Sequence, residues 1–147
     1  MKKQAIKTFV LLSLLLSVSA IYVNAQTKTL IRNVEIPFDF SVGNKTFPAG
    51  VYSVTSVNQE KIMLRLRSGD GRETIHIITS PVQAKQTPET SKLIFRRYGE
   101  TYFLSQIWES YNEQGRQLAK SRTEQSVERD LAKRGERPAI VDLVATP

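Results

Sequence analysis

The sequence of 147 residues contains no cysteine, and this absence excludes several kinds of chemistry at once. Disulfide bonds, thiol nucleophiles and cysteine-ligated metals are ruled out, as is membrane attachment through a lipidated cysteine. Histidine is almost absent too, with one residue, His76, in the whole chain. Any Ser-His-Asp triad or imidazole metal site would therefore have to use His76.

His76 lies in the middle of a predicted strand, between Ile75 and Ile77. Functional side chains concentrate in loops, so we interpret His76 as a strand residue that faces solvent or a satisfied partner. The chain also contains neither a G-x-S-x-G elbow nor an H-E-x-x-H helix. We therefore predict a protein that is not an enzyme, with no catalytic residue, no cofactor and no metal site.

The first 25 residues have the pattern of a cleavable signal peptide. Lys2, Lys3 and Lys7 precede an apolar run, Phe9–Ile21, and a small-x-small cleavage pattern follows at residues 23–25. The alternative is an uncleaved anchor, but the run is shorter than the ~18–20 residues that cross a bilayer. The pattern predicts a periplasmic or secreted protein that keeps no membrane span after cleavage.

The processed chain would start at Gln26 and have the length of one domain. Three of the 21 basic residues leave with the signal peptide, so 18 basic residues stand against 14 acidic ones, a net charge of +4. Solubility accounts for a charge of this size, and we expect no nucleic-acid partner. An exported domain without disulfides fits a bacterial periplasm.

Apolar and polar residues alternate between about residues 30 and 109, which predicts half-buried strands. Val34, Ile36, Phe38 and Phe40 share one face, and Pro37 between them indicates an edge or bulged strand. Residues 80–91 read as a polar loop. Further strands are expected at 51–57, at 61–67 with Ile62, Leu64 and Leu66 inward, and at 72–79 with Ile75 and Ile77 on one face and His76 and Ile78 on the other.

Residues 92–109, KLIFRRYGETYFLSQIWE, predict a β-hairpin with a two-residue turn at Gly99-Glu100. This register places Arg97 opposite Tyr102. Both faces of the hairpin are apolar, so it lies between two layers or leaves a patch for something else to cover. One face is expected to carry Leu93, Phe95, Tyr102, Leu104 and Trp108, and the other Ile94, Tyr98, Phe103 and Ile107.

The aromatic residues and the arginine of this hairpin are the candidate ligand or partner surface: Arg97, Tyr102, Trp108, Tyr98 and Phe103. An arginine beside aromatic rings suits a sugar or an anionic ligand. The alternative is core aromatics with an arginine at the rim, because such cross-strand pairs commonly stabilise sheets.

The chain changes character after Tyr111. Residues 112–115 read as a turn, and 117–133 favour a helix, with a capping box at Ser121-x-x-Glu124 and a stop at Gly135. The thin apolar stripe of Leu118, Val127 and Leu131 predicts a solvated helix docked by a narrow seam, not a membrane-surface helix, with partner binding as an alternative. The final AIVDLVATP is β-prone and suits pairing with a sheet edge.

These patterns predict a mainly β protein: a single antiparallel β-sandwich or small barrel of about six to seven strands with a C-terminal helix. The expected organisation is a signal peptide (1–25), an antiparallel β domain (26–111) and a C-terminal helical arm and tail (112–147).

Three segments, VEIPFDFSVGNKTFPAGVYSV, KLIFRRYGETYFLSQIW and GRQLAKS, resemble a family of small exported bacterial proteins that are numerous in acidobacterial genomes. The resemblance spans about residues 34–128. It implies export and a compact β domain, and it carries over no activity, ligand or catalytic residue.

Two functional hypotheses follow. The first is a non-enzymatic exported β-domain that binds a partner protein or polysaccharide of the cell envelope. The second is a carbohydrate-active hydrolase or lyase whose carboxylates are brought together by the fold; a purely structural envelope protein is a third alternative. The candidate carboxylates of the second hypothesis are Glu35, Asp39, Asp70, Glu73, Glu100 and Glu109, of which two would have to lie within ~10 Å across a concave pocket.

Overall fold

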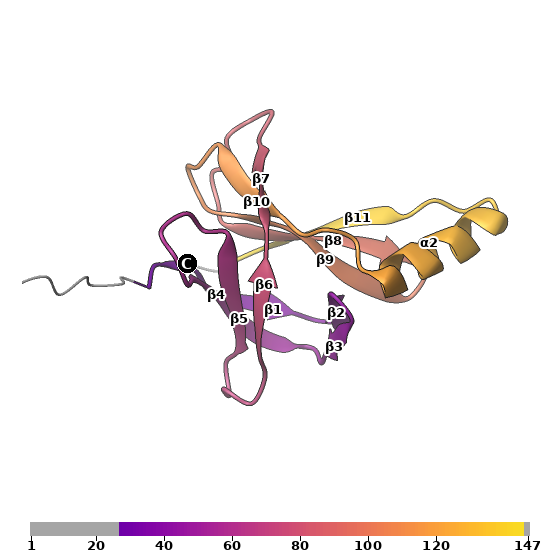
Figure 1. Cartoon of the computed structure of the whole chain (residues 1–147), viewed down its shortest axis with the longest axis horizontal. Helices are drawn as coiled ribbons and strands as arrows, with labels where there is room; N and C mark the ends of the chain where they lie inside the picture. The colour runs from indigo at the N-terminus through magenta and orange to yellow at the C-terminus, as the bar shows by residue number, and fades with distance from the viewer. Residues whose placement is uncertain (1–26, 146–147) are drawn as a thin grey trace, which may run out of the picture.

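Two β-sheets packed against each other form the part of the chain that this computed structural model describes, residues 27–145 (Figure 1). The predicted signal peptide, residues 1–25, lies outside the described residues. The prediction of a mainly β fold with a C-terminal helix is confirmed. Within the described residues the sheets form no closed barrel, which leaves the sandwich.

The smaller sheet has the order β1-β4-β5-β6 and the larger has seven strands, so the described residues contain 11 strands where about six to seven were expected. Most neighbours are antiparallel, but β2 runs parallel to β9. The smaller sheet contains β1 (Thr29–Ile36), β4 (Gly50–Ser56), β5 (Met63–Ser68) and β6 (Thr74–Ile78). The larger contains β2 (Phe40–Val42), β3 (Lys45–Phe47), β7 (Ser80–Gln83), β8 (Lys92–Tyr98), β9 (Thr101–Trp108), β10 (Gln114–Gln117) and β11 (Ala139–Val144).

The chain crosses from the smaller sheet to the larger between β1 and β2. Val34, Ile36 and Phe40 are buried and Phe38 is half-buried, which confirms that they share one face. Pro37 has no N–H to donate to a ladder, and β1 ends at the residue before it. The side-chain alternation therefore continues through the crossing while the backbone changes sheets.

The strands β7 and β10 correct the expectations from the sequence. Residues 80–83 were expected in a loop, and residues 114–117 overlap the turn expected at 112–115 and the first residue of the helix expected at 117–133. The two strands pair with each other antiparallel over their whole length. Each contains a residue that disfavours strands, Pro81 in β7 and Gly115 in β10. Local strand propensity is therefore low in both segments, and they form strands only because they pair with each other. Ile62 also departs from expectation: it precedes β5 and is 48 % exposed.

The tip of the β8–β9 hairpin has the predicted register. Arg97 pairs with Tyr102 and Phe95 with Leu104. Gly99 has a φ of +62°, the left-handed value that a two-residue hairpin turn needs from its first residue.

A β-bulge shifts this register farther from the turn. Ile94 pairs with Gln106, so Ser105 is an additional residue in β9. A one-residue shift moves every later side chain to the opposite face. Ile107 is therefore in the core, and Trp108 is on the outer face, away from the smaller sheet. The predicted faces of these two residues are wrong.

The core lies between the two sheets, and aromatic rings fill its centre. The ring of Phe40 meets those of Phe47, Tyr52 and Phe95 at centroid distances of 5.6, 5.1 and 5.5 Å. The buried members of this cluster are Leu30, Ile31, Val34, Ile36, Phe40, Val42, Phe47, Tyr52, Val54, Leu64, Leu66, Ile77, Leu93, Phe95, Leu104, Ile107 and Leu118.

The C-terminal arm belongs to the larger sheet. The strands β10 and β11 both follow the boundary expected at Tyr111, and β11 pairs with β8 as a new edge strand, which confirms the expected edge pairing. Between them, α2 (Arg122–Lys133) begins at the predicted cap, where the Ser121 hydroxyl accepts a hydrogen bond from the Glu124 N–H at 3.1 Å. It ends before Gly135, whose φ is +74°.

The helix α2 covers part of the outer face of the larger sheet (Figure 1). Val127 and Leu131 pack against Tyr98 and Phe103 in a small second core, which confirms docking by a narrow seam. Leu118, which was expected on the helix stripe, precedes α2 and is buried between the two sheets.

Candidate functional site

The structure does not bring the five hairpin candidates to one surface. Tyr98 and Phe103 are buried under α2. Tyr102 stacks on Phe38 with ring centroids 3.8 Å apart and an interplanar angle of 14°. Arg97 is exposed opposite Tyr102, whereas Trp108 lies in a separate cleft on the outer face.

A buried ion pair fixes α2 over the hairpin. Arg96 donates to both carboxylate oxygens of Glu124, at 2.5 and 3.2 Å, and also to the Ser105 hydroxyl at 2.7 Å. Tyr98 donates its hydroxyl to Glu124 at 3.0 Å. Burial, followed by the charge of Glu124, raises the pKa of Tyr98. No buried side-chain polar atom of residues 27–145 lacks a hydrogen-bond partner, this network included. Together with the packing of Val127 and Leu131 on Tyr98 and Phe103, the network holds α2 over this half of the apolar face.

The candidate carboxylates are largely engaged in structural contacts. Asp39 accepts the Ala49 N–H at 2.9 Å and so braces the turn in VGNKTFPAGVYSV, while Glu109 binds both Lys28 and Lys61, at 2.6 and 2.7 Å. Burial acts to raise the pKa of Glu109, but the hydrogen bonds from the two lysines outweigh it, and the net shift is downward.

Two of these carboxylates, Asp70 and Glu73, line one hollow of about 410 Å³ beside residues 48–52. A hydrogen bond from Ser68, supported by Arg72, lowers the pKa of Asp70, and Glu73 binds Lys45 at 2.6 Å. A glycosidase needs one carboxylic acid with a raised pKa as its proton donor. The pKa of Asp70 is lowered instead of raised, so Asp70 does not fit the role of proton donor.

His76 is exposed on the outer face of the smaller sheet, where its Nε2 accepts a hydrogen bond from Arg65 Nε at 3.2 Å. This confirms the interpretation as a satisfied strand histidine. Residues 27–145 contain no group of three or more His, Asp or Glu side chains placed to hold a metal ion.

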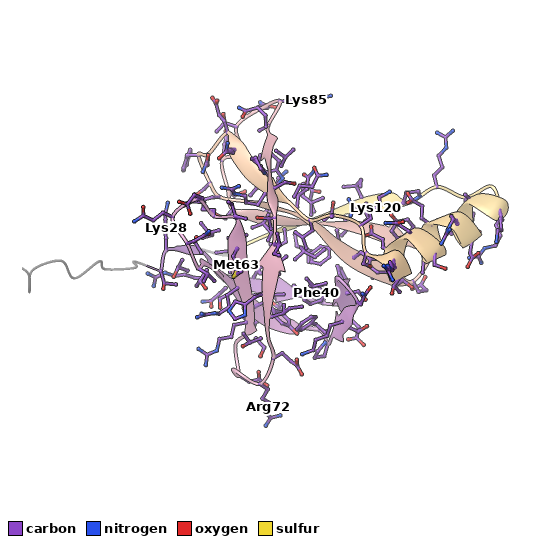
Figure 2. The ribbon with its side chains drawn as sticks, in the orientation of Figure 1. Lys28, Phe40, Met63, Arg72, Lys85 and Lys120 are labelled. Atoms are coloured by element: carbon purple, nitrogen blue, oxygen red, sulfur yellow. The ribbon has the colours of Figure 1, made fainter. Side chains whose placement is uncertain are left out.

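One hollow lies on the outer face of the larger sheet, beside the half that α2 covers. We call it the outer cleft; its volume is about 620 Å³, and it is lined by residues 82–89, Lys92, Ile94, Gln106 and Trp108. Strands β8 and β9 supply the floor, and the segment that leaves β7 supplies the wall. Lys85 lies at the tip of that segment (Figure 2).

Backbone hydrogen bonds hold the wall of the outer cleft in place. The Ala84 N–H donates to the Glu113 carbonyl and the Tyr111 N–H to the Pro88 carbonyl, both at 2.8 Å. The Ser110 N–H donates to the Ser91 hydroxyl at 3.0 Å. The turn between β9 and β10 therefore fastens this segment at both ends, and the cleft is a formed feature of the fold.

Trp108, the only tryptophan of the chain, is held in one orientation in the outer cleft. Its Nε1 donates to the side-chain oxygen of Gln106 at 3.0 Å. Its ring lies directly on Gly115, where an added Cβ would stand 2.5 Å from the ring atom Cε3. Only glycine at this position of β10 leaves room for the indole.

Sequence reasoning identified Trp108 but missed the rest of the cleft. Residues 82–89 show no periodicity and contain Pro88, so their pattern indicates a loop and nothing about what the loop encloses. The one feature of the sequence that could have indicated the cleft is Gly115, seven residues after the only tryptophan, Trp108. The sequence does not show that these two residues are in contact.

Comparison of the chain with protein-family models, with curated proteins and with solved structures finds no match. No helix in residues 27–145 has the length and apolar character needed to cross a membrane.

Proposed function

We propose that this chain is an exported, non-enzymatic binding module that holds a component of the bacterial cell envelope in the outer cleft. The observation that carries the proposal is the cleft itself: an apolar floor of Trp108 and Ile94 under a wall of polar side chains. Its volume falls within the ~300–1,000 Å³ range of ligand pockets, and its lining combines the apolar floor with several polar side chains that can hydrogen-bond a ligand. Export from the signal pattern of residues 1–25 is part of this proposal.

The proposal predicts that filling the cleft abolishes binding. The variant Ala84→Phe adds a ring to the cleft wall without entering the core, and Ile78→Phe adds the same ring to the outer face of the smaller sheet. The mature protein is mixed with isolated insoluble envelope polymer and with soluble envelope fractions, and retention is measured by co-sedimentation and affinity capture. Wild type and Ile78→Phe should be retained, and Ala84→Phe should lose most retention.

Equal retention of Ala84→Phe and wild type, or no retention of either, would contradict the proposal. Arg97→Ala tests the hairpin surface separately, because Arg97 is exposed and lies outside the cleft lining. The C-terminal arm cannot be tested by deleting it, because truncation after Tyr111 would remove β10, α2 and β11 and so disrupt the larger sheet.

The hydrolase remains a second candidate, because Asp70 and Glu73 line one hollow. Release of reducing ends from envelope polysaccharide by wild type, lost in both Asp70→Asn and Glu73→Gln, would support it. Equal background release by all three proteins would remove it.

A further inference from the structure

We infer that the ligand of the outer cleft is an uncharged oligosaccharide stretch, an inference that rests on the proposed function. The proposed function names only an envelope component. The charges, the hydrogen-bonding groups and the apolar floor of the cleft each restrict that component further.

The charges of the cleft lining cancel. Lys92 is paired with Asp142 of β11 at 3.0 Å, and the two other charged side chains, Lys85 and Glu89, have opposite signs. A cleft for an acidic polymer would present several unpaired cations, as phosphate and carboxylate sites do. This cleft attracts neither sign, so a polyanion or polycation gains nothing there over the solvent.

The uncharged polar groups of the lining are mostly amides. Gln86 and Gln106 each carry an acceptor oxygen and two N–H donors, Gln83 carries the same groups but donates one N–H to the Glu113 carboxylate at 3.4 Å, and Thr87 adds a hydroxyl. Trp108 occupies the oxygen of Gln106, which fixes the amide with its N–H groups available as donors. Ligand hydroxyls both donate and accept and can satisfy this mixed set, whereas a lipid chain would leave the amides desolvated and unpaired.

The floor provides the apolar contact that a sugar ring also needs, since a pyranose has C–H groups on its faces and hydroxyls around its rim. Ile94 and Trp108 are neighbours on this floor, and 6 % of the Trp108 surface is exposed. A ligand can therefore touch the indole only over that small exposed part, and Ile94 supplies the rest of the apolar contact. Because Trp108 is the only tryptophan, the tryptophan emission of the protein comes from the floor of the cleft alone.

The experiment is a tryptophan-fluorescence titration of the mature protein. Maltohexaose, cellohexaose and N-acetylchitohexaose are the uncharged probes, hexagalacturonate is the anionic one, and an uncharged hexapeptide represents polypeptide. We expect saturable change with at least one uncharged sugar and none with the other two classes. Gln86→Leu should weaken that binding about threefold to tenfold, as loss of one hydrogen bond predicts, while Gln59→Leu, outside the cleft, should not.

The outcomes separate this inference from the proposed function. Binding of hexagalacturonate or of the peptide that Ala84→Phe abolishes, without binding of an uncharged sugar, would overturn the inference and leave the binding module intact. Sugar binding unaffected by Ala84→Phe would place the ligand elsewhere and overturn both. No response to any probe overturns the inference, and the envelope co-sedimentation then decides the proposed function on its own.

Discussion

The outer faces of the two sheets are covered to very different extents, although both sheets are built from alternating strands. On the smaller sheet, the outer face carries Met63 (labelled in Figure 2), Ile78 and the pair Arg65–His76, and the side chains of Met63, His76 and Ile78 are exposed. On the larger sheet, α2 covers Tyr98 and Phe103, and the segment after β7 overhangs Trp108.

The difference follows from what each face would otherwise expose. Large aromatic side chains on the larger sheet make covering it favourable, at ~25 cal/mol for each Å² of apolar surface buried. On the smaller sheet polar side chains separate the aliphatic ones, and scattered exposed aliphatic residues are ordinary at protein surfaces. The half of the larger sheet under α2 is sealed, and the half under the loop remains open as the outer cleft.

The strongest test of this comparison is removal of the ion pair beneath α2. In Glu124→Ala, Arg96 keeps a largely buried charge without its carboxylate, so we expect a loss of about 3–5 kcal/mol in the free energy of unfolding. Urea denaturation measures it. Glu128→Ala, on the same helix, removes the carboxylate that pairs with Lys120. This pair is more exposed than Arg96–Glu124, so the loss should be less than about 1 kcal/mol. Equal losses would mean that α2 is not held by the buried pair.

The next largest effect concerns the open half of the same face. Gly115→Ala places a methyl group 2.5 Å from Cε3 of Trp108, which is closer than the two atoms can approach. We therefore expect a loss of about 1–3 kcal/mol in the free energy of unfolding and a shift of the tryptophan emission. The control is Gly69→Ala, where an added Cβ meets ordinary contacts of 3.4 Å or more and φ is not left-handed. Unchanged emission in Gly115→Ala would show that the indole does not rest on β10.

The pH dependence of stability tests the part of the larger sheet that α2 covers. An unfolded tyrosine ionises near pH 10, whereas burial and Glu124 raise the pKa of Tyr98 in the fold. Above pH 10 the unfolded state binds fewer protons than the folded state, so stability should fall with rising pH, by up to ~1.4 kcal/mol per pH unit. Below pH 10 Tyr98 is protonated in both states, so its contribution to the free energy of unfolding does not change with pH.

The comparison for this test is Tyr98→Phe, which cannot ionise. Its stability deficit relative to wild type should narrow between pH 10 and pH 11 in urea denaturation. The exposed Tyr111, substituted by Phe, should leave the pH dependence unchanged. If the stability of Tyr98→Phe relative to wild type stayed constant across this interval, the raised pKa of Tyr98 would be contradicted.

The smallest effect is expected on the uncovered face. Ile78 is 74 % exposed, so Ile78→Ala should change the free energy of unfolding by no more than about 0.5 kcal/mol. Thermal and urea denaturation measure it. A loss above about 1 kcal/mol would show that this face is also buried, and the contrast between the sheets would disappear.

Much of the strand content could be predicted, because a half-buried strand repeats every two residues whatever its partners. The alternation through Val34, Ile36 and Phe40 is confirmed, although it crosses between sheets. The helix cap at Ser121 and the turn at Gly99 are also local and were found. The short strands β7 and β10 were missed because their pairing is long-range.

The candidate site was less predictable. The aromatic residues of the hairpin were identified, but the bulge at Ser105 separates Trp108 from Tyr102, and no local signal marks it. Glu124 was predicted only as part of the capping box of a solvated helix, yet it is buried because Arg96, 28 positions earlier, lies beneath it.

By itself, the sequence determined which residues can lie on one face of a strand, where α2 begins and which catalytic groups are scarce, since these depend on neighbours within a few residues. Only the tertiary structure decided which faces are covered and where a cleft remains. Burial and register arise from contacts between segments far apart in the chain. The indole of Trp108 resting on Gly115, under a wall of residues 82–89, is the clearest case.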